Sequence, residues 1–544
     1  DWTGPAAAVR SLPRLWRVPG TPRPARAETE IVLRAGRPVA LRAFAADGAL
    51  LRGPLPEHAR QLTYVWFRDS ASRVASGAFR WRVGDEGPWM FLPPDQPTQL
   101  ELLWPAPGFG TVVCHARNGE DGFMASDTPC GLTVAADGML ELWLNEALAL
   151  TAAARLEAML ARSREADYTF GSDVAAHCAV AHDRLAAMDA VILAAPGDAF
   201  AARRQRAVLA DAALVEALWG LEKLVLQRAE QDIVRHKHLQ RTLQVTLSDG
   251  TPAAGAELRY RQVQHAFNFG IFVNPVTHPV SREPFDGKLW TALKELGINH
   301  VTLPFLWSRH EPTRGQRRDA EQDAVFPAAD LARAGYRLKG HISVWPWHGR
   351  YPDQWDAYTP GWLYTLSAAD VQEAAYHHQY ALAAFNHECV YGFQAINEPM
   401  LSHTNAVNLT LPETLELTRR SSAGLRAGGS TGPIEVNNCC VFAESVNADV
   451  HEQGYERMPL EFFEDLEAAG IDYDVVGIQL YYGGYMMSRL FQGGFPIRHL
   501  ADLSDVIDRA SAFGKPVNVS EVSTPSEAPP ADGPFVGEWH GPWT

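Results

Sequence analysis

Seven short apolar runs recur along the C-terminal half of the chain, separated by helical stretches, and this alternation predicts a (β/α)₈ barrel. Successive runs lie 32 to 53 residues apart, so each interval holds one βα unit, and their centres fall near residues 270, 302, 341, 394, 435, 477 and 518. Nearly continuous apolar strands indicate a parallel sheet covered on both faces. A doubly wound sheet is the alternative, but it more often carries a glycine-rich phosphate loop after its first strand.

The seventh run is the last one visible, and an eighth strand would fall near residue 559, past Thr544. The residues that follow Glu521 form a proline-rich stretch, Pro525 to Pro534, and a tail without the spacing of a helix or a strand. We therefore expect a barrel over residues 264–544 that lacks strand 8 in this chain.

The N-terminal half divides by composition. After an irregular segment at 1–27, residues 28–145 hold short β runs separated by turn residues such as Asn118-Gly119, a spacing typical of a β-sandwich. Residues 146–238 place apolar side chains at helical spacing and predict two to four helices. Residues 239–263 predict a short β pair joined at Ser248 to Pro252, which leads into the barrel.

The predicted sandwich carries aromatic and thiol groups whose roles the sequence leaves open. Its tryptophans either stack on a bound sugar or fill the core; they are Trp66, Trp81, Trp89 and Trp104. Cys114 and Cys130 either pair across two strands or stay reduced like the other four cysteines.

Two glutamates end strands in the barrel segment, where reactive residues of such barrels lie. The fourth run ends in Asn397-Glu398-Pro399 and the seventh in Ser520-Glu521. A single carboxylate after a strand often caps the next helix. Two of them, three units apart, can face each other about 5 Å apart, the spacing at which a retaining glycosidase uses one as nucleophile and the other as acid. Asn397 can hydrogen-bond the sugar 2-hydroxyl beside them.

Residues from about Gln264 to Thr544 resemble glycoside hydrolase family 10, the retaining endo-β-1,4-xylanases. The matching segments are Phe267-Asn268-Phe269-Gly270, the E-P-x-x-G-like Glu311 to Gln316, Gly340 to Trp345 and Gly477-Ile478-Gln479. The resemblance implies that Glu398 is the acid/base and Glu521 the nucleophile. It also implies a subsite for the reacting sugar lined by His341, Trp345, Asn397 and Gln479.

The chain departs from the family pattern in ways that bear on substrate choice. Aligned through Trp307, which is included among the expected substrate-binding residues, it has Thr302, Leu303 and Leu306 where the family has Glu, Asn and Lys. Tyr481 stands where the family has a histidine on strand six, and a tyrosine there can still donate to the nucleophile. We therefore expect a divergent relative acting on a β-linked, xylan-like plant polysaccharide, with a non-catalytic carbohydrate-binding barrel as the alternative.

Neither a metal nor an organic cofactor is expected. A barrel metallohydrolase would want H-x-H after strand one, where this chain has Gly270-Ile271-Phe272. Four barrel histidines are the alternative candidates for a metal cluster; they are His341, His348, His377 and His378. The histidines of the helical segment have no carboxylate or cysteine at ligand spacing; they are His177, His182, His236 and His238.

The charge balance limits the partners. Lys and Arg total 48 against 64 Asp and Glu, a net charge of −16, which argues against nucleic-acid and anionic-membrane surfaces as partners. No apolar run approaches the length of a transmembrane helix, and no signal peptide is visible in the printed sequence. The substrate class alone suggests a secreted or periplasmic location.

Overall fold

The computed structural model describes residues 38–44, 49, 66–68, 81–84, 87–91, 99–117, 132–134, 140–191, 199–237, 243–259, 267–272, 288–320, 328–343, 359–386, 388–399, 407, 409–438, 441, 459–481 and 499–523. None of the helices in these ranges has both the length and the apolar character that crossing a membrane requires.

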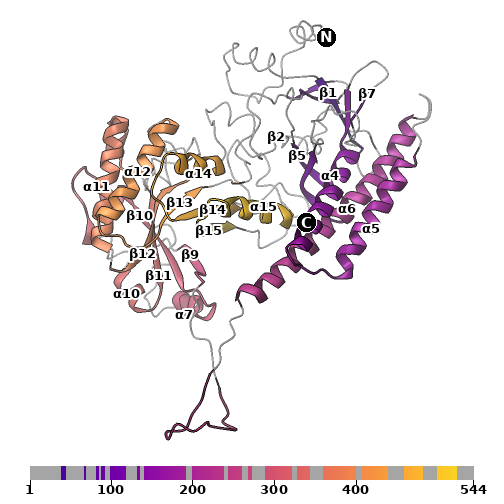
Figure 1. Cartoon of the computed structure of the whole chain (residues 1–544). Coiled ribbons are helices and arrows are strands. Elements are labelled where there is room, and N and C mark those ends of the chain that lie inside the picture. The colour runs from indigo at the N-terminus through magenta and orange to yellow at the C-terminus, as the bar shows by residue number, and fades with distance from the viewer. Residues whose placement is uncertain are drawn as a thin grey trace.

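All seven predicted barrel strands are confirmed, and they form one parallel sheet that curls into a partial barrel (Figure 1). Neighbours in the sheet follow the chain order, with the first and last strands at its two edges. The strands are β9 (Gly270–Phe272), β10 (His300–Leu306), β11 (Arg337–Ser343), β12 (Val390–Asn397), β13 (Ile434–Asn438), β14 (Val475–Tyr481) and β15 (Val517–Ser523). The position expected for an eighth strand lies outside the described residues.

Helices connect successive strands and cover the outside of the sheet (Figure 1). They are α7 (Lys288–Glu295), α8 (Trp307–His310), α10 (Ala328–Arg333), the 3₁₀ turn η3 (Gly361–Thr365), α11 (Ala368–Asn386), α12 (Leu411–Ala427), α14 (Pro459–Ala468) and α15 (Leu500–Ser511). Their inner faces and the strands share one hydrophobic core. Gly424 lets α12 approach α11 closely, because a Cβ there would lie 2.4 Å from the carbonyl oxygen of Tyr376.

The described N-terminal strands belong to two sheets. One has the order β3-β4-β1-β8-β7 and the other β2-β5-β6. Their members are β1 (Pro38–Arg42), β2 (Trp66–Arg68), β3 (Trp81–Gly84), β4 (Gly87–Phe91), β5 (Gln99–Ala106), β6 (Gly110–Arg117), β7 (Leu132–Val134) and β8 (Leu140–Trp143). Packing of the two sheets as a sandwich stays a prediction.

Three long helices follow, and strands β5 and β6 pack on them. They are α4 (Leu144–Glu165), α5 (Ser172–Asp189) and α6 (Ala199–Asp232), which continues as the π-turn η1 (Ile233–Lys237). Trp104 is 2% exposed in the core that these helices share with the strands, which favours a core role for this tryptophan. Cys114 lies in the same core as a free thiol.

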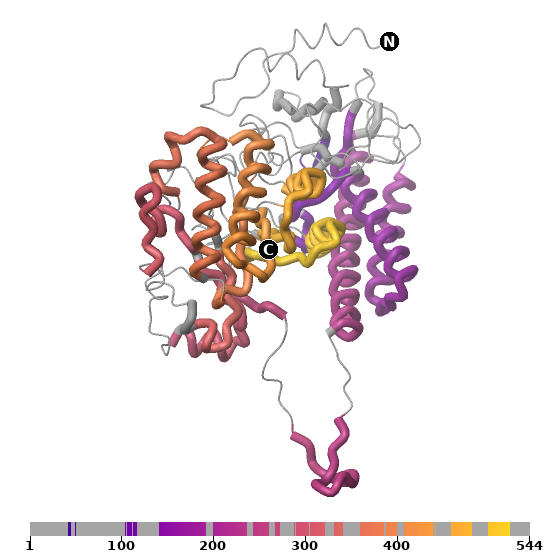
Figure 2. Tube along the Cα trace, turned by 60° about the vertical axis from the view of Figure 1, so that its left-hand side comes forward, coloured from indigo at the N-terminus to yellow at the C-terminus, as the bar shows by residue number. Residues whose placement is uncertain are grey.

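Residues 243–259 project from the rest of the described chain (Figures 1 and 2). Their bridge joins Thr246 to Pro252, so the chain reverses within the predicted turn, and no strand is found over residues 257–259 of the predicted second β segment. The reversal is tight because Leu247 accepts a hydrogen bond from the Gly250 amide and donates to the Thr251 carbonyl.

Helix α15 joins the two halves of the molecule (Figure 2). Ala501, at its start, packs in a hydrophobic cluster with Leu156 of α4 and Leu221 of α6. The backbone N–H of Leu500 donates to Glu222 of α6 at 2.7 Å, which satisfies one of the free amides at the helix N-terminus. Since α15 leads directly into β15, the N-terminal helices support the strand that carries Glu521.

A buried cluster of charged side chains stabilises the contact between α15 and the N-terminal half. Asp502 of α15, 5% exposed, accepts hydrogen bonds from Arg155 of α4 at 2.7 Å and from His115 of β6 at 3.0 Å. Arg155 also bonds Asp505, one turn further along α15. Burial would raise the pKa of Asp502, but the charges of His499, His115 and Arg155 hold it well below its usual range. We call Arg155, His115, Asp502 and Asp505 the α15 clamp.

Candidate active site

The two glutamates predicted from the strand ends lie together, and one amide joins them. The side-chain nitrogen of Gln479, on β14, donates to Glu398 Oε1 at 2.9 Å and to Glu521 Oε1 at 2.8 Å. Gln479 is 1% exposed, and both carboxylates are partly buried. Because one donor bonds both oxygens, the two carboxylates lie close together, as the spacing of about 5 Å in retaining glycosidases requires.

A register shift in β12 determines which of its side chains point into the barrel here. In a regular strand, residues three apart point to opposite faces, yet Gln394 donates to Asn397 Oδ1 at 2.8 Å. The register of β12 on β13 shifts between Gln394 and Ile396, which brings both side chains to one side. Glu398 then leaves the strand with a left-handed φ of 50°, a conformation that residues with a Cβ adopt rarely.

Strand β15 has a comparable irregularity beside the second carboxylate. Ile478 of β14 pairs with Val519, but the next residue, Gln479, pairs with Glu521, so Ser520 is an inserted residue. The Ser520 hydroxyl bonds the Asn437 side chain inside the barrel, while Glu521 meets Gln479. The bulge therefore lets two consecutive residues of β15 reach the same interior.

The electrostatics favour the protonated form of Glu398. Burial and, next, the negative charge of Glu521 raise the pKa of Glu398 to about 8, against the lowering effect of hydrogen bonds from Gln479 and Asn397. Glu398 is thus protonated at neutral pH and can give up a proton to a leaving oxygen.

An amide network lies behind Glu398. The side-chain oxygen of Asn397 accepts from Gln394 at 2.8 Å, from Asn437 at 2.6 Å and, at 3.4 Å, from Gln479. These four side chains are each at most 8% exposed. The network links strands β12, β13 and β14 directly below the carboxylates.

A second polar layer lies one step earlier along alternate strands. Lys339 of β11 donates to Glu435 of β13 at 2.8 Å, and Asn518 of β15 donates to the other oxygen of Glu435 at 2.5 Å. Aliphatic side chains fill such layers in most barrels of this type. Here the buried pair and Asn518 together link three strands that are not neighbours in the sheet.

The remaining predicted site residues are placed as follows. His341 lies on β11 in register with Gln394, and Tyr481 ends β14; only their backbone is described. Trp345 falls outside the described residues. Trp307 is 1% exposed, stacks on His378 with ring centres 4.5 Å apart and donates to Glu311 at 3.0 Å, so it offers almost no exposed surface to a sugar.

Sequence reasoning missed Gln394, Asn437 and Ser520, which lie within or directly after the predicted strand runs. Polar residues inside otherwise apolar strands are the signal that was available, because a buried amide needs a partner on another strand. Lys339 and Glu435 carry the same signal more strongly, since isolated buried charges are costly.

Among the described residues, one group has metal-ligand spacing; it is formed by His499 together with His115 and Asp502 of the α15 clamp. The guanidinium of Arg155 lies 2.7 Å from Asp502 and 3.2 Å from His499, where it supplies the positive charge itself. A cation would have to displace it. The side chains of His377 and His378 do not come together as ligands, because His377 is exposed beside Glu373 and His378 is buried against His310.

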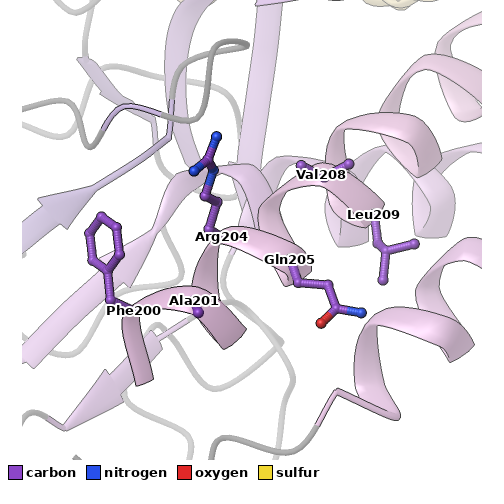
Figure 3. A pocket seen from close by; sticks show the side chains of 6 residues that line it. All are labelled: Phe200, Ala201, Arg204, Gln205, Val208 and Leu209. Carbon is purple, nitrogen blue, oxygen red and sulfur yellow. The ribbon is translucent and has the colours of Figure 1, made fainter. Parts of the chain in front are cut away.

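A hollow of about 440 Å³ lies at the start of α6 (Figure 3). It is lined mainly by apolar surface, with Phe200 and Val208 largely exposed, and is formed by Phe200, Ala201, Arg204, Gln205, Val208 and Leu209. It shares no residue with the carboxylate pair.

Comparison with known proteins gives a distant likeness in fold. No family model matches the chain, and no curated protein matches it. Similar solved structures include a GH10 protein from Paenibacillus barcinonensis, at 14% identity over 48% of this chain and 72% of that one, with a TM-score of 0.32. Xylanase B from Clostridium stercorarium F9 is 16% identical over 49% and 74%, with a TM-score of 0.34.

A third similar structure is the GH53 catalytic domain of Ignisphaera aggregans, 18% identical over 45% of this chain and 63% of that one, with a TM-score of 0.32. Likeness at this level does not bear on activity, so the functional argument below depends on the site itself.

Proposed function

We propose that this chain is a retaining glycoside hydrolase that cleaves a β-linked, xylan-like plant polysaccharide by double displacement. Glu521 attacks the anomeric carbon, and Glu398 protonates the leaving oxygen and then activates water. The observation that supports this proposal most is the single Gln479 amide that bonds both carboxylates. A protein that only binds sugar needs neither a nucleophile nor an acid.

The first test is a screen for reducing sugar on soluble xylan and mixed β-glucans, with binding to the same glycans followed by gel shift. Sugar release that disappears in both Glu398→Gln and Glu521→Gln supports the proposal. Binding without release by the unaltered chain supports a non-catalytic carbohydrate-binding barrel instead.

The pH profile follows from the raised pKa of Glu398. Because Glu398 must carry a proton to act as the acid, kcat/KM is expected to fall as pH rises through about 8. The hydrogen bond from Gln479 lowers this pKa, so Gln479→Met should move the alkaline limb to higher pH as well as reduce the rate. Gln372→Met, on α11, removes a side-chain bond to the Glu413 carbonyl and is the control. An alkaline limb that stays in place or moves down would contradict the assignment.

Substrate preference depends on the second barrel strand. Leu303 and Leu306 are 1% and 3% exposed and offer no hydrogen bond to a sugar, and each such bond to a buried partner is worth about 1 to 3 kcal/mol. We expect weak activity on unsubstituted xylo-oligosaccharides and better activity on another β-glycan. Initial rates on both substrate types measure this, and faster hydrolysis of linear xylo-oligosaccharides than of every other β-glycan would refute it.

A further inference from the structure

We propose that Gln394 and Asn437 are positioning residues that hold the Asn397 amide with its NH₂ group toward Glu398 and the reacting sugar. On the proposed function, from which this inference starts, the site then recognises the sugar at this point by donating a hydrogen bond. The shape of the surrounding structure does not by itself fix that orientation, because an asparagine amide fits the same space when turned by 180°. The hydrogen-bond partners must fix it.

The carboxylates determine the orientation of the first amide. Gln479 has one end within 2.9 Å of both Glu398 and Glu521. An amide oxygen there would face two acceptor groups, of which Glu521 is taken as ionised, so the NH₂ end must occupy this place.

The orientation of the Gln479 amide in turn determines that of the Asn397 amide. The same Gln479 nitrogen lies 3.4 Å from the Asn397 side-chain oxygen. If Asn397 were turned, two NH₂ groups would face each other at that distance without an acceptor between them. The oxygen of Asn397 therefore points into the barrel, and its NH₂ group points to Glu398, with which it forms a hydrogen bond.

Gln479 is too distant to hold Asn397 in this state by itself, and the two shorter bonds do so. Gln394 donates to the Asn397 oxygen at 2.8 Å, and Asn437 donates at 2.6 Å. Asn437 is held in turn by Ser520, whose hydroxyl bonds the Asn437 side-chain oxygen. Both lone pairs of the Asn397 oxygen are thus occupied from inside the barrel, which leaves only the NH₂ group for Glu398 and a ligand.

Isosteric acids reverse the hydrogen bonds without changing side-chain size. In Gln394→Glu or Asn437→Asp, an ionised carboxylate would attract the Asn397 NH₂ group inward and turn its oxygen toward Glu398. We expect kcat to fall about 10- to 100-fold with little change in KM, because the lost contact strengthens mainly in the transition state. When acid pH protonates the new carboxyl, it donates as the amide did, and activity should recover toward that of the parent.

The control is Asn438→Asp, the same substitution one residue along β13. Asn438 is fully buried and donates to the Pro459 carbonyl at 3.0 Å, and as the next residue of β13 it points to the opposite face of the strand from Asn437. It should cost stability without the acid recovery of kcat. If all three variants show the same pH profile, or if Gln394→Glu keeps parental kcat at neutral pH, Gln394 and Asn437 do not position Asn397.

A measurement without substrate separates this inference from the proposed function. The folded-state pKa of Glu398, about 8, is above the usual carboxyl value, so stability relative to Glu398→Gln should fall as pH rises from about 4.3 to 8 and then level off. In the neutral variant Gln394→Met the Asn397 bond to Glu398 weakens, and the fall should extend to higher pH. If this pH range is the same in Gln394→Met as in the parent, the positioning role is wrong even if sugar is released. If the range moves to higher pH in a chain that releases no sugar, the positioning role holds and the proposed glycosidase function is wrong.

Discussion

Glu521→Ala is expected to stop sugar release, and azide is expected to restore it with inverted configuration at the anomeric carbon. Removing the carboxylate leaves a space beside Gln479, and in the proposed mechanism this space lies on the face from which the nucleophile attacks. A small anion in that space displaces the leaving group in a single step, which inverts the carbon. The anomeric configuration of the glycosyl azide is the quantity to measure. A retained product would mean that Glu521 is not the nucleophile.

Glu398→Ala is the complementary variant and should give the opposite stereochemistry. With an activated leaving group the covalent intermediate still forms on Glu521, and azide then attacks it from the side where Glu398 activates water, so configuration is retained. Loss of acid/base catalysis should cost about 10²- to 10⁴-fold on an unactivated substrate. Glu467→Ala removes a surface carboxylate paired with Lys515 and should leave the rate unchanged.

Arg155→Met is expected to lower the free energy of unfolding by about 3 to 5 kcal/mol, because it leaves the buried carboxylate of Asp502 without its cation. The side chains of Arg155 and Asp502 are 10% and 5% exposed, so water cannot replace the lost charge. Urea denaturation at neutral pH measures the change. A loss below about 1 kcal/mol, the value of an exposed pair, would show that the α15 clamp contributes little.

An exposed ion pair provides the control for this loss. Lys515→Met breaks the more exposed pair with Glu467 and should cost less than about 1 kcal/mol.

The strands of the partial barrel could be predicted because a parallel sheet covered on both faces requires an apolar run for every strand. That the side chains of Glu398 and Glu521 lie together could be predicted for a related reason, since the carboxyl ends of parallel strands meet at one edge of the sheet. The register of the strands could not be read in this way. The shifts beside Gln394 and Ser520 change which side chains enter the barrel, and no pattern of period two reveals a single inserted residue.

Contacts between distant parts of the chain were also beyond the sequence. His115 and Asp502 are separated by 387 positions, and neither stands in a local pattern that indicates a partner. The buried state of Trp307 was hidden for the same reason, because the residue stacked on it, His378, comes from α11. Local periodicity assigns a residue to an element, whereas the partner across an interface depends on how elements pack.

The α15 clamp has a consequence for how this chain can be divided. A fragment that starts at β9 would keep Asp502 and Asp505 but lose Arg155 and His115, and it would expose the face of Ala501 that packs on the N-terminal helices. The helix with these defects leads directly into the strand of Glu521. The barrel half is therefore not a transplantable module: grafting it onto another protein would carry over both carboxylates without the support that holds one of them in place.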